Sequence, residues 1–282
     1  MSREILWKSQ NETLTEVVII ILGIKKRFRG DELVNSLDLM GVPYSIVDGL
    51  DASQVKIPED WRNEKRSYFM VGRSLTDAEI ACTWGHWQAI KVGMEARAEW
   101  ILVIEDNVKP IYINEIHQAL SCLQLFQPTL ISFHSDPNYN LEFKKKIVTP
   151  SMELKKCLSM PTSTKCYAVN LSGQRKLNAD YEKYGFQGYL ADFPLFYGQG
   201  LLILRSRTFP VNVEVTNSII GNRQYLSKFS KFQRIFSTRH GTLRSWLQSE
   251  NSSIYSFMRS TFLRWFCFKI NSNTLLRSLW RN

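Results

Sequence analysis

The chain has 282 residues, of which 44% are hydrophobic and 22% charged, and its formal net charge is +10. This length and composition indicate a globular protein with one large α/β domain, or such a domain with an extension. The five cysteines form no CxxC pair and no metal-finger spacing, which argues against a disulfide framework and for a cytosolic protein. The sequence shows neither a signal peptide nor a membrane-spanning segment, so we expect a cytoplasmic protein.

The positive charge is concentrated at the C-terminus. Residues 226–282 contain ten basic residues and one acidic residue, so they carry +9 of the net charge, and the remainder of the chain is almost neutral. We therefore predict a main domain over residues 1–221 and a basic, aromatic-rich helical extension over residues 222–282. Aromatic, arginine and lysine side chains alternate in residues 254–269, which suggests a helix lying on an anionic membrane surface.

The first elements form a βαβ pattern. Residues 16–24, EVVIIILGI, are short, apolar and β-branched, which predicts a buried strand in a parallel sheet. A helix is expected over residues 30–41, because its apolar pattern is closed by a glycine. Residues 43–49 then predict a second strand, which ends in a turn at Asp48 and Gly49.

After an irregular loop over residues 50–73, the segment SLTDAEIACTWGHWQAIKVGMEARAEW predicts a long helix. Thr76 and Glu79 match the S/T-x-x-E capping box at its start. Glu79 and His86 fall on one face of this helix, away from the apolar stripe. The strand WILVIE, residues 100–105, should follow and complete a second βα repeat.

Farther along, the hydrophobic pattern predicts two more helices and three more strands. The helices are expected at residues 114–125 and 171–184, and the strands at residues 128–134, 164–170 and 201–206. The polar and basic residues 138–157 are interpreted as an excursion from the sheet.

The strand WILVIE ends abruptly in Glu105, Asp106 and Asn107. Asp and Asn are depleted in strands, and an unpaired charge at the edge of a core is costly, so these side chains suggest a function. Ligands of open α/β sheets bind at the carboxyl ends of strands, and hard oxygen ligands on a tight turn suit Mg²⁺ or Mn²⁺ with a diphosphate. The alternative interpretation is an acidic turn that caps the next helix.

Four segments carry a resemblance to a known family. VVIIILGIKKRFRG, YSIVDGLDAS, LTDAEIACTWGHWQAIK and WILVIEDNV occur in the order and at the spacing of glycosyltransferase family 25. This family contains bacterial lipooligosaccharide and lipopolysaccharide galactosyltransferases, with collagen galactosyltransferases as relatives. The segments TKCYAVNLSGQRKL and ADFPLF resemble later motifs of the same family.

The resemblance implies a GT-A-like fold, in which a Rossmann-like mixed, mostly parallel sheet is flanked by helices. It also implies a nucleotide-sugar donor such as UDP-galactose, a divalent metal, Mn²⁺ or Mg²⁺, and a saccharide or lipid-linked saccharide acceptor. A metal held between a carboxylate and the phosphates would neutralise the leaving diphosphate as a Lewis acid.

The resemblance also assigns roles to single residues. Asp106 and Asn107 match the metal ligands, but Asn107 replaces the second Asp of the family, and an amide oxygen brings no charge to the metal. Glu105 would hold the ribose or orient Asp106. Asp192 matches the Asp expected to act as the base for the acceptor hydroxyl, although it is equally well placed as the N-cap of a following helix.

The remaining candidates are predicted donor-binding residues: Lys26, Arg27, Asp48, Gly49, Glu79 and His86. Each has a structural alternative. The basic pair could be a solvated loop, Asp48 and Gly49 could serve the turn, and a histidine beside two tryptophans is often a hydrogen-bonded core residue.

The sequence therefore predicts a hexosyltransferase that moves galactose from UDP-galactose to a bacterial surface glycan, acting in the cytoplasm or peripherally on the inner membrane. The competing hypothesis, favoured by Asn107, is a catalytically silent homologue that binds a nucleotide sugar or a glycan. Nucleic-acid binding through the basic extension ranks last, because the main domain is nearly neutral and the sequence carries no DNA- or RNA-binding motif.

Overall fold

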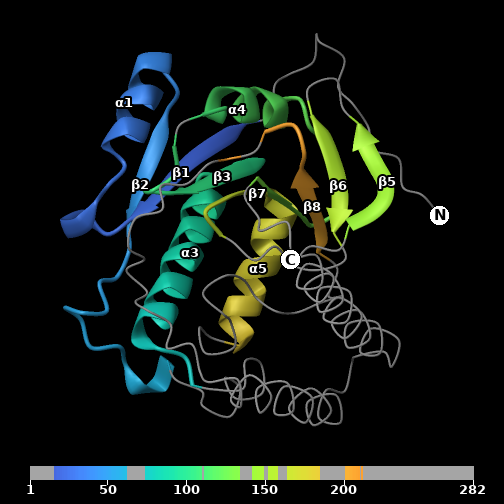
Figure 1. The fold of residues 1–282 in the computed structure, drawn as a ribbon. Coiled ribbons are helices and arrows are strands. Elements are labelled where there is room, and N and C mark those ends of the chain that lie inside the picture. Colours follow the sequence, from blue (N-terminus) through green and yellow to red (C-terminus); the bar gives the residue numbers. More distant parts are fainter. Residues whose placement is uncertain are drawn as a thin grey trace, which may run out of the picture.

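A computed structural model describes residues 16–61, 74–109, 111–133, 142–148, 152–157, 164–184, 201–209 and 211 (Figure 1). The strands are β1 (Val17–Gly23), β2 (Tyr44–Asp48), β3 (Trp100–Glu105), β4 (Thr129–Ser132), β5 (Glu142–Val148), β6 (Glu153–Cys157), β7 (Cys166–Asn170) and β8 (Leu202–Ser206). The helices are η1 (Lys25–Arg27), α1 (Asp31–Met40), η2 (Glu59–Trp61), α3 (Asp77–Glu95), α4 (Ile113–Ser121) and α5 (Leu171–Tyr184). The predicted extension over residues 222–282 and the candidate base Asp192 lie outside the described residues.

The described strands form one eight-stranded sheet in the order β2-β1-β3-β7-β4-β8-β6-β5. Helices cover both faces, so the predicted α/β class is confirmed (Figure 1). The expectation of a mostly parallel sheet needs a correction. Parallel pairing is confined to β2-β1-β3 and to β4 with β8, because β7 runs antiparallel to both of its neighbours and β6 runs antiparallel to β8 and β5.

Successive residues of the central strands enter two different cores, as the alternation of a β-strand requires. On one face, Ile19, Ile21 and Leu102 pack with residues of α1 and α4. On the other face, Ile20 and Val103 pack with residues of α3 and α5. Burial on both faces explains why β1 and β3 are almost continuously apolar, and why both were recognisable in the sequence.

Helix α3 begins where the capping box predicts. The Glu79 backbone N–H donates to the Thr76 hydroxyl oxygen at 3.2 Å, and the Thr76 backbone N–H donates to Glu79 Oε2 at 3.0 Å. The helix approaches the sheet closely at Gly93, where a Cβ atom would collide with the Ile101 Cγ2 atom. This close contact fixes the height of α3 above β3.

Two predictions of local structure were wrong in detail. The described residues 142–148 and 152–157 of the predicted excursion belong to the sheet, because β5 and β6 pair antiparallel and β6 joins β8, with Leu154 opposite Ser206 and fully buried. The α4 helix ends at Ser121 rather than at residue 125. The indole N–H of Trp100 donates to the carbonyl of Leu123 at 3.0 Å, which holds the chain in a turn after the helix.

Within the described residues, no helix combines the length and apolarity needed to span a membrane.

Candidate functional site

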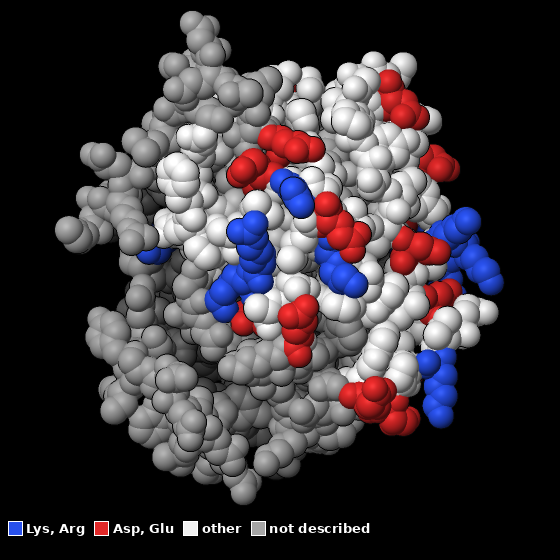
Figure 2. Space-filling view, turned by 180° about the vertical axis from the view of Figure 1, so that it is seen from behind, with Lys and Arg blue, Asp and Glu red and all other residues white. Residues whose placement is uncertain are grey.

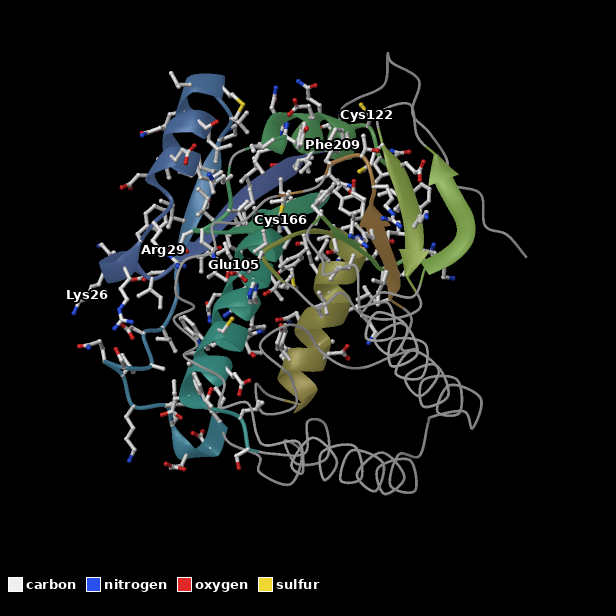
Figure 3. All side chains as sticks on the ribbon, viewed as in Figure 1. Lys26, Arg29, Glu105, Cys122, Cys166 and Phe209 are labelled. Carbon is white, nitrogen blue, oxygen red and sulfur yellow. The ribbon has the colours of Figure 1, made fainter. Side chains whose placement is uncertain are left out.

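The carboxyl ends of β2, β1 and β3 lie side by side at one edge of the sheet. The register places Gly23 opposite Asp48 and Leu22 opposite Glu105. Beyond the strands, the Asp106 N–H donates to the Leu22 carbonyl at 3.0 Å. Because these three strands are parallel, polar residues from three separate segments meet here, as ligand sites of α/β proteins require. Figure 3 shows Arg29 and Glu105 at this edge.

The Asp106 carboxylate is buried and paired with an arginine. It is 5% exposed, and its Oδ1 atom accepts a hydrogen bond from the Arg29 guanidinium at 2.7 Å. Its Oδ2 atom accepts from the Arg29 backbone N–H at 3.2 Å. The sequence did not indicate Arg29, because the family resemblance assigns the basic positions after β1 to Lys26 and Arg27. The ion pair joins residues 77 positions apart, so only the fold reveals it.

Gly23 makes room for this carboxylate. A Cβ atom at position 23 would lie 2.9 Å from Asp106 Oδ2, 3.0 Å from Asp106 Cβ and 2.8 Å from the Phe28 ring. Contacts this short would force the carboxylate or the ring to move. The glycine that ends β1 is therefore part of the site, although no chemistry could be read from it in the sequence.

Glu105 points to the α3 face of the sheet, like Ile101 and Val103 before it. Its Oε1 atom accepts a hydrogen bond from the Thr164 hydroxyl at 2.8 Å, just before β7 begins. The backbone N–H of Glu105 donates to the carbonyl of Lys165 at 2.8 Å. The segment before β7 thus fixes both the side chain and the backbone of Glu105, which has 23% of its side chain exposed and remains accessible from solvent.

His86 lies behind Glu105 and not at the surface. It is 3% exposed, and its Nε2 atom is 3.8 Å from Glu105 Oε1, which exceeds hydrogen-bond length. Its Nδ1 atom lies 3.1 Å from the hydroxyl of Tyr167. Burial lowers the pKa of His86 to about 4, so the ring is neutral at pH 7.

Burial also raises the pKa of Tyr167, so its hydroxyl keeps its proton and can donate to Nδ1 of His86. A ring that accepts at Nδ1 carries its proton on Nε2, the atom that faces Glu105. In the part of the chain that the structure describes, this Nε2 atom has no hydrogen-bond partner. His86 is therefore a buried, neutral side chain that lies next to the Glu105 carboxylate on the α3 side.

Glu79, the other polar residue on this face of α3, serves the helix start. Its side chain is 2% exposed, and its Oε2 atom accepts hydrogen bonds from the backbone and hydroxyl of Thr76 at 3.0 and 3.3 Å. Seven residues separate it from His86, which is about 10 Å along a helix. The two predicted donor-binding residues therefore lie in different parts of the structure.

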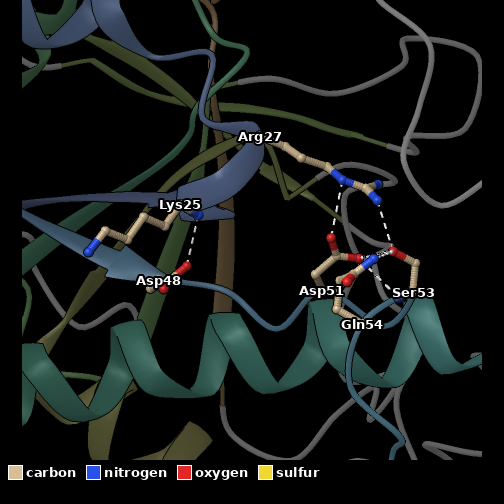
Figure 4. Close-up of polar contacts among 6 residues, drawn as sticks. All are labelled: Lys25, Arg27, Asp48, Asp51, Ser53 and Gln54. Atoms are coloured by element: carbon tan, nitrogen blue, oxygen red, sulfur yellow. Dashed lines mark hydrogen bonds and ion pairs between the residues drawn. The ribbon is translucent and has the colours of Figure 1, made fainter.

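Among the other predicted donor-binding residues, Arg27 and Asp48 are held by neighbouring loops (Figure 4). The Arg27 guanidinium contacts Asp51 at 3.1 Å and the Ser53 hydroxyl at 2.8 Å. Hydrogen bonds from Ser53, with a smaller contribution from Arg27, hold the pKa of Asp51 below its usual value. Asp48 accepts from the Lys25 backbone N–H at 2.8 Å and so closes the turn after β1.

Lys26 and Gly49 are the last two of the predicted donor-binding residues. Lys26 is exposed on η1, and Figure 3 shows its side chain directed away from the sheet. Gly49 donates its N–H to the carbonyl of Gly23 at 2.7 Å, which ties the end of β2 to the end of β1. These contacts show that Asp48 and Gly49 form the turn, which was the alternative to donor binding in the sequence analysis. Both residues lie at the same edge of the sheet as Asp106.

Asp106 and Asn107 offer one carboxylate and one amide oxygen to a cation. Asn107 Oδ1 is buried and has no hydrogen-bond partner within the described segments, which is costly for a polar atom. Mg²⁺ and Mn²⁺ commonly take one or two protein oxygens and complete their shell with phosphate and water, and this donor set fits that pattern. The described residues contain no cluster of three or more His, Cys, Asp or Glu that could hold a metal without such help.

Two glycines at this edge provide a matched test of the packing around Asp106. We expect Gly23→Ala to lower the free energy of unfolding by roughly 1–3 kcal/mol, because the added methyl group collides with Asp106 and Phe28. Gly49→Ala should be nearly neutral, since its Cβ atom would have no contact shorter than 3.4 Å. Urea unfolding of both variants measures the difference, and equal costs would contradict the packing described here.

The buried His86 makes stability depend on pH. Its pKa is about 4 in the folded chain and near 6.5 when exposed, so the unfolded chain binds the proton more tightly. Below pH 6.5 the folded state should therefore lose stability, by roughly 3 kcal/mol when pH 4 is reached. The free energy of unfolding of the wild type should therefore fall more between pH 6.5 and pH 4 than that of His86→Gln, which has no histidine at this position. A difference between the two proteins that is constant from pH 7 to pH 4 would contradict the buried, neutral histidine.

Comparison with known proteins places this geometry in a family. Residues 17–191, more than half of the chain, match the model of glycosyltransferase family 25, described as an LPS biosynthesis protein. No curated protein matches the chain. Among solved structures, a glycosyltransferase involved in the glycosylation of the major capsid of PBCV-1 is 12% identical, with a TM-score of 0.29, and the match covers 60% of this chain and 67% of that chain. The matched residues contain the whole edge formed by β1, β2 and β3, and the chain belongs to glycosyltransferase family 25.

Proposed function

We propose that this glycosyltransferase moves galactose from UDP-galactose to a saccharide acceptor of a bacterial surface glycan, of the lipopolysaccharide or lipooligosaccharide type. The description of the matched family supports the glycan class. The choice of galactose follows the galactosyltransferases that the sequence motifs resemble. The proposal places the protein in the cytoplasm, where nucleotide sugars are made.

The observation that carries the proposal is the buried Asp106 beside Arg29 and Asn107 at the carboxyl edge of the sheet. A nucleoside diphosphate leaves with two or more negative charges, so the enzyme must supply positive charge as the glycosidic bond breaks. Asp106 and Asn107 are the residues that would hold Mn²⁺ or Mg²⁺, which acts as a Lewis acid on the diphosphate when bound. Arg29 adds a guanidinium at the same place.

Glu105 and Asp192 take the remaining roles in this proposal. The Thr164 hydroxyl and the Lys165 carbonyl fix Glu105, and a fixed carboxylate with an accessible edge suits the ribose hydroxyls of a nucleotide. Lys26 and Arg27, both exposed on η1, are proposed to steady the nucleotide phosphates as these extend outward from the sheet edge. Asp192, outside the described residues, is proposed as the base that accepts the proton of the acceptor hydroxyl.

A second candidate function has one specific observation in its favour. Position 107 carries an amide in place of a carboxylate, and both Asp106 oxygens accept hydrogen bonds from Arg29. A homologue that binds the nucleotide sugar but transfers nothing would show these same features. Turnover separates the two functions, whereas donor binding alone does not.

Membrane contact is proposed for the C-terminal extension and not for the body. Figure 2 shows acidic and basic side chains interspersed over the described part of one face, so this face presents no single-sign patch to an anionic surface. The +9 charge of residues 226–282 is the better candidate for attraction to anionic lipid and to a lipid-linked acceptor. Co-sedimentation of the full chain with anionic and with neutral vesicles tests this, and equal recovery with both would contradict it.

The proposed donor predicts a defined pattern of nucleotide release. With Mn²⁺ and a lipopolysaccharide-core oligosaccharide, the wild type should release UDP from UDP-galactose faster than from UDP-glucose or UDP-N-acetylglucosamine. Asp106→Asn should lower kcat/KM by about 100-fold or more, because the diphosphate loses the charge that holds its cation. EDTA should have a similar effect on the wild type.

Wild-type protein that binds UDP-galactose without any release of UDP, across a panel of acceptors, would favour the silent homologue. Faster release from another nucleotide sugar would replace galactose in the proposal and leave the reaction class unchanged.

A further inference from the structure

Arg29 occupies both oxygens of the residue that is expected to bind the metal. Its guanidinium donates to Asp106 Oδ1 at 2.7 Å, and its backbone N–H donates to Oδ2 at 3.2 Å. The side chain of Arg29 is 31% exposed, while that of Asp106 is 5% exposed. The arginine is therefore the solvent-accessible partner of this ion pair, and the carboxylate is the buried one.

A guanidinium and a divalent cation compete for this position. Both carry positive charge, and both would bind the Oδ1 atom of Asp106, so their simultaneous presence is opposed by electrostatic repulsion. The adjacent Asn107 oxygen is buried and has no hydrogen-bond partner among the described residues, so Arg29 does not satisfy it. A cation that binds both oxygens would satisfy it, at the cost of the Arg29 contact with Oδ1.

We propose that Arg29 is an exchangeable counter-ion. In the metal-free enzyme it neutralises Asp106, and in the loaded enzyme its guanidinium leaves Oδ1 and pairs with the diphosphate of the donor. This inference rests on the proposed function, because it takes the ligand to be a nucleoside diphosphate. Arginine suits both partners, since its planar donors match carboxylate and phosphate oxygens alike.

The exchange couples the two ligands. Without a nucleotide, release of Arg29 costs a charge-assisted hydrogen bond, so binding of the cation alone is weakened. With a diphosphate present, the released guanidinium gains a new anionic partner, so each ligand strengthens binding of the other. Arg27 takes no part in the exchange at Asp106, because its guanidinium contacts Asp51 and Ser53.

Mn²⁺ binding to the full-length protein tests the exchange, measured by electron paramagnetic resonance of the free ion. We expect Arg29→Gln to tighten Mn²⁺ binding about tenfold or more in the absence of nucleotide, the size of one charge-assisted hydrogen bond. In the presence of saturating Mn²⁺, the same variant should bind UDP about tenfold more weakly, as calorimetry would show.

The matched control is Lys25→Gln, which removes one positive charge from the same segment. The structural contact of Lys25 with Asp48 uses its backbone N–H, so this substitution keeps it. We expect Mn²⁺ and UDP affinities within about twofold of the wild type. Arg29→Lys, which keeps the charge but not the planar donors, should fall between the wild type and Arg29→Gln in both measurements.

Opposite changes in the two affinities are the signature of exchange. If Arg29→Gln leaves Mn²⁺ affinity unchanged or weakens it while the protein remains folded by circular dichroism, the exchange is wrong. Loss of both affinities in Arg29→Gln and Arg29→Lys alike would show a purely structural role and overturn it equally. Wild-type protein that fails to bind UDP at any Mn²⁺ concentration would instead contradict the proposed function, whatever the Mn²⁺ affinities of the variants.

Discussion

The burial of one negative charge governs the geometry of this site. Asp106 follows a strand that is enclosed on both faces, and its carboxylate has almost no contact with water. A buried carboxylate without a partner would cost several kcal/mol or would take up a proton. The surrounding residues stabilise the buried carboxylate. Arg29 supplies the opposite charge, Gly23 leaves space for the carboxylate, and the pairing of β1 with β3 holds the backbone in place.

The site has an outer and an inner layer. Arg29 and Arg27 both come from the segment after β1, where Arg29 contacts Asp106 and Arg27 contacts Asp51. Beneath them, Thr164 fixes Glu105, while the neutral His86 faces it from α3 with the Tyr167 hydroxyl beside its other nitrogen. In the exchange that we propose, Arg29 rearranges around a diphosphate, whereas Glu105 and His86 keep their contacts with Thr164 and Tyr167. A rigid carboxylate next to an exchangeable ion pair is a suitable arrangement for a reaction in which charge moves onto a leaving group.

Local signals predicted most of the fold. The strands β1 and β3 are predictable from their continuous apolar runs, because such runs indicate burial on both faces of a sheet. Helix α3 is predictable from its capping box, because this motif marks the start of a helix. The β5–β6 hairpin was missed for the opposite reason. Its residues are polar and basic, and their strand conformation depends on pairing with β8, which lies some 50 residues farther along the chain.

The candidate site was predicted in part. The triplet Glu105, Asp106 and Asn107 was identified because charged and amide side chains are unexpected at the end of a buried strand. Arg29 and Thr164 were not, since an arginine in a basic loop and a threonine before a strand carry no local sign of the carboxylates that they contact. For His86, the sequence offered a hydrogen-bonded core residue as the structural alternative, and its burial agrees with that alternative, but the sequence carries no sign of its contact with Tyr167.

We propose that Asp106, relieved of Arg29, forms the cation and diphosphate site of this enzyme. A crystal structure of the full chain with UDP and Mn²⁺, using the anomalous scattering of manganese, tests it most directly. We expect an anomalous peak beside an Asp106 oxygen, with the Arg29 guanidinium on the diphosphate. A diphosphate bound elsewhere, or bound at this edge while Arg29 remains on Asp106 and no metal lies beside it, would contradict the claim.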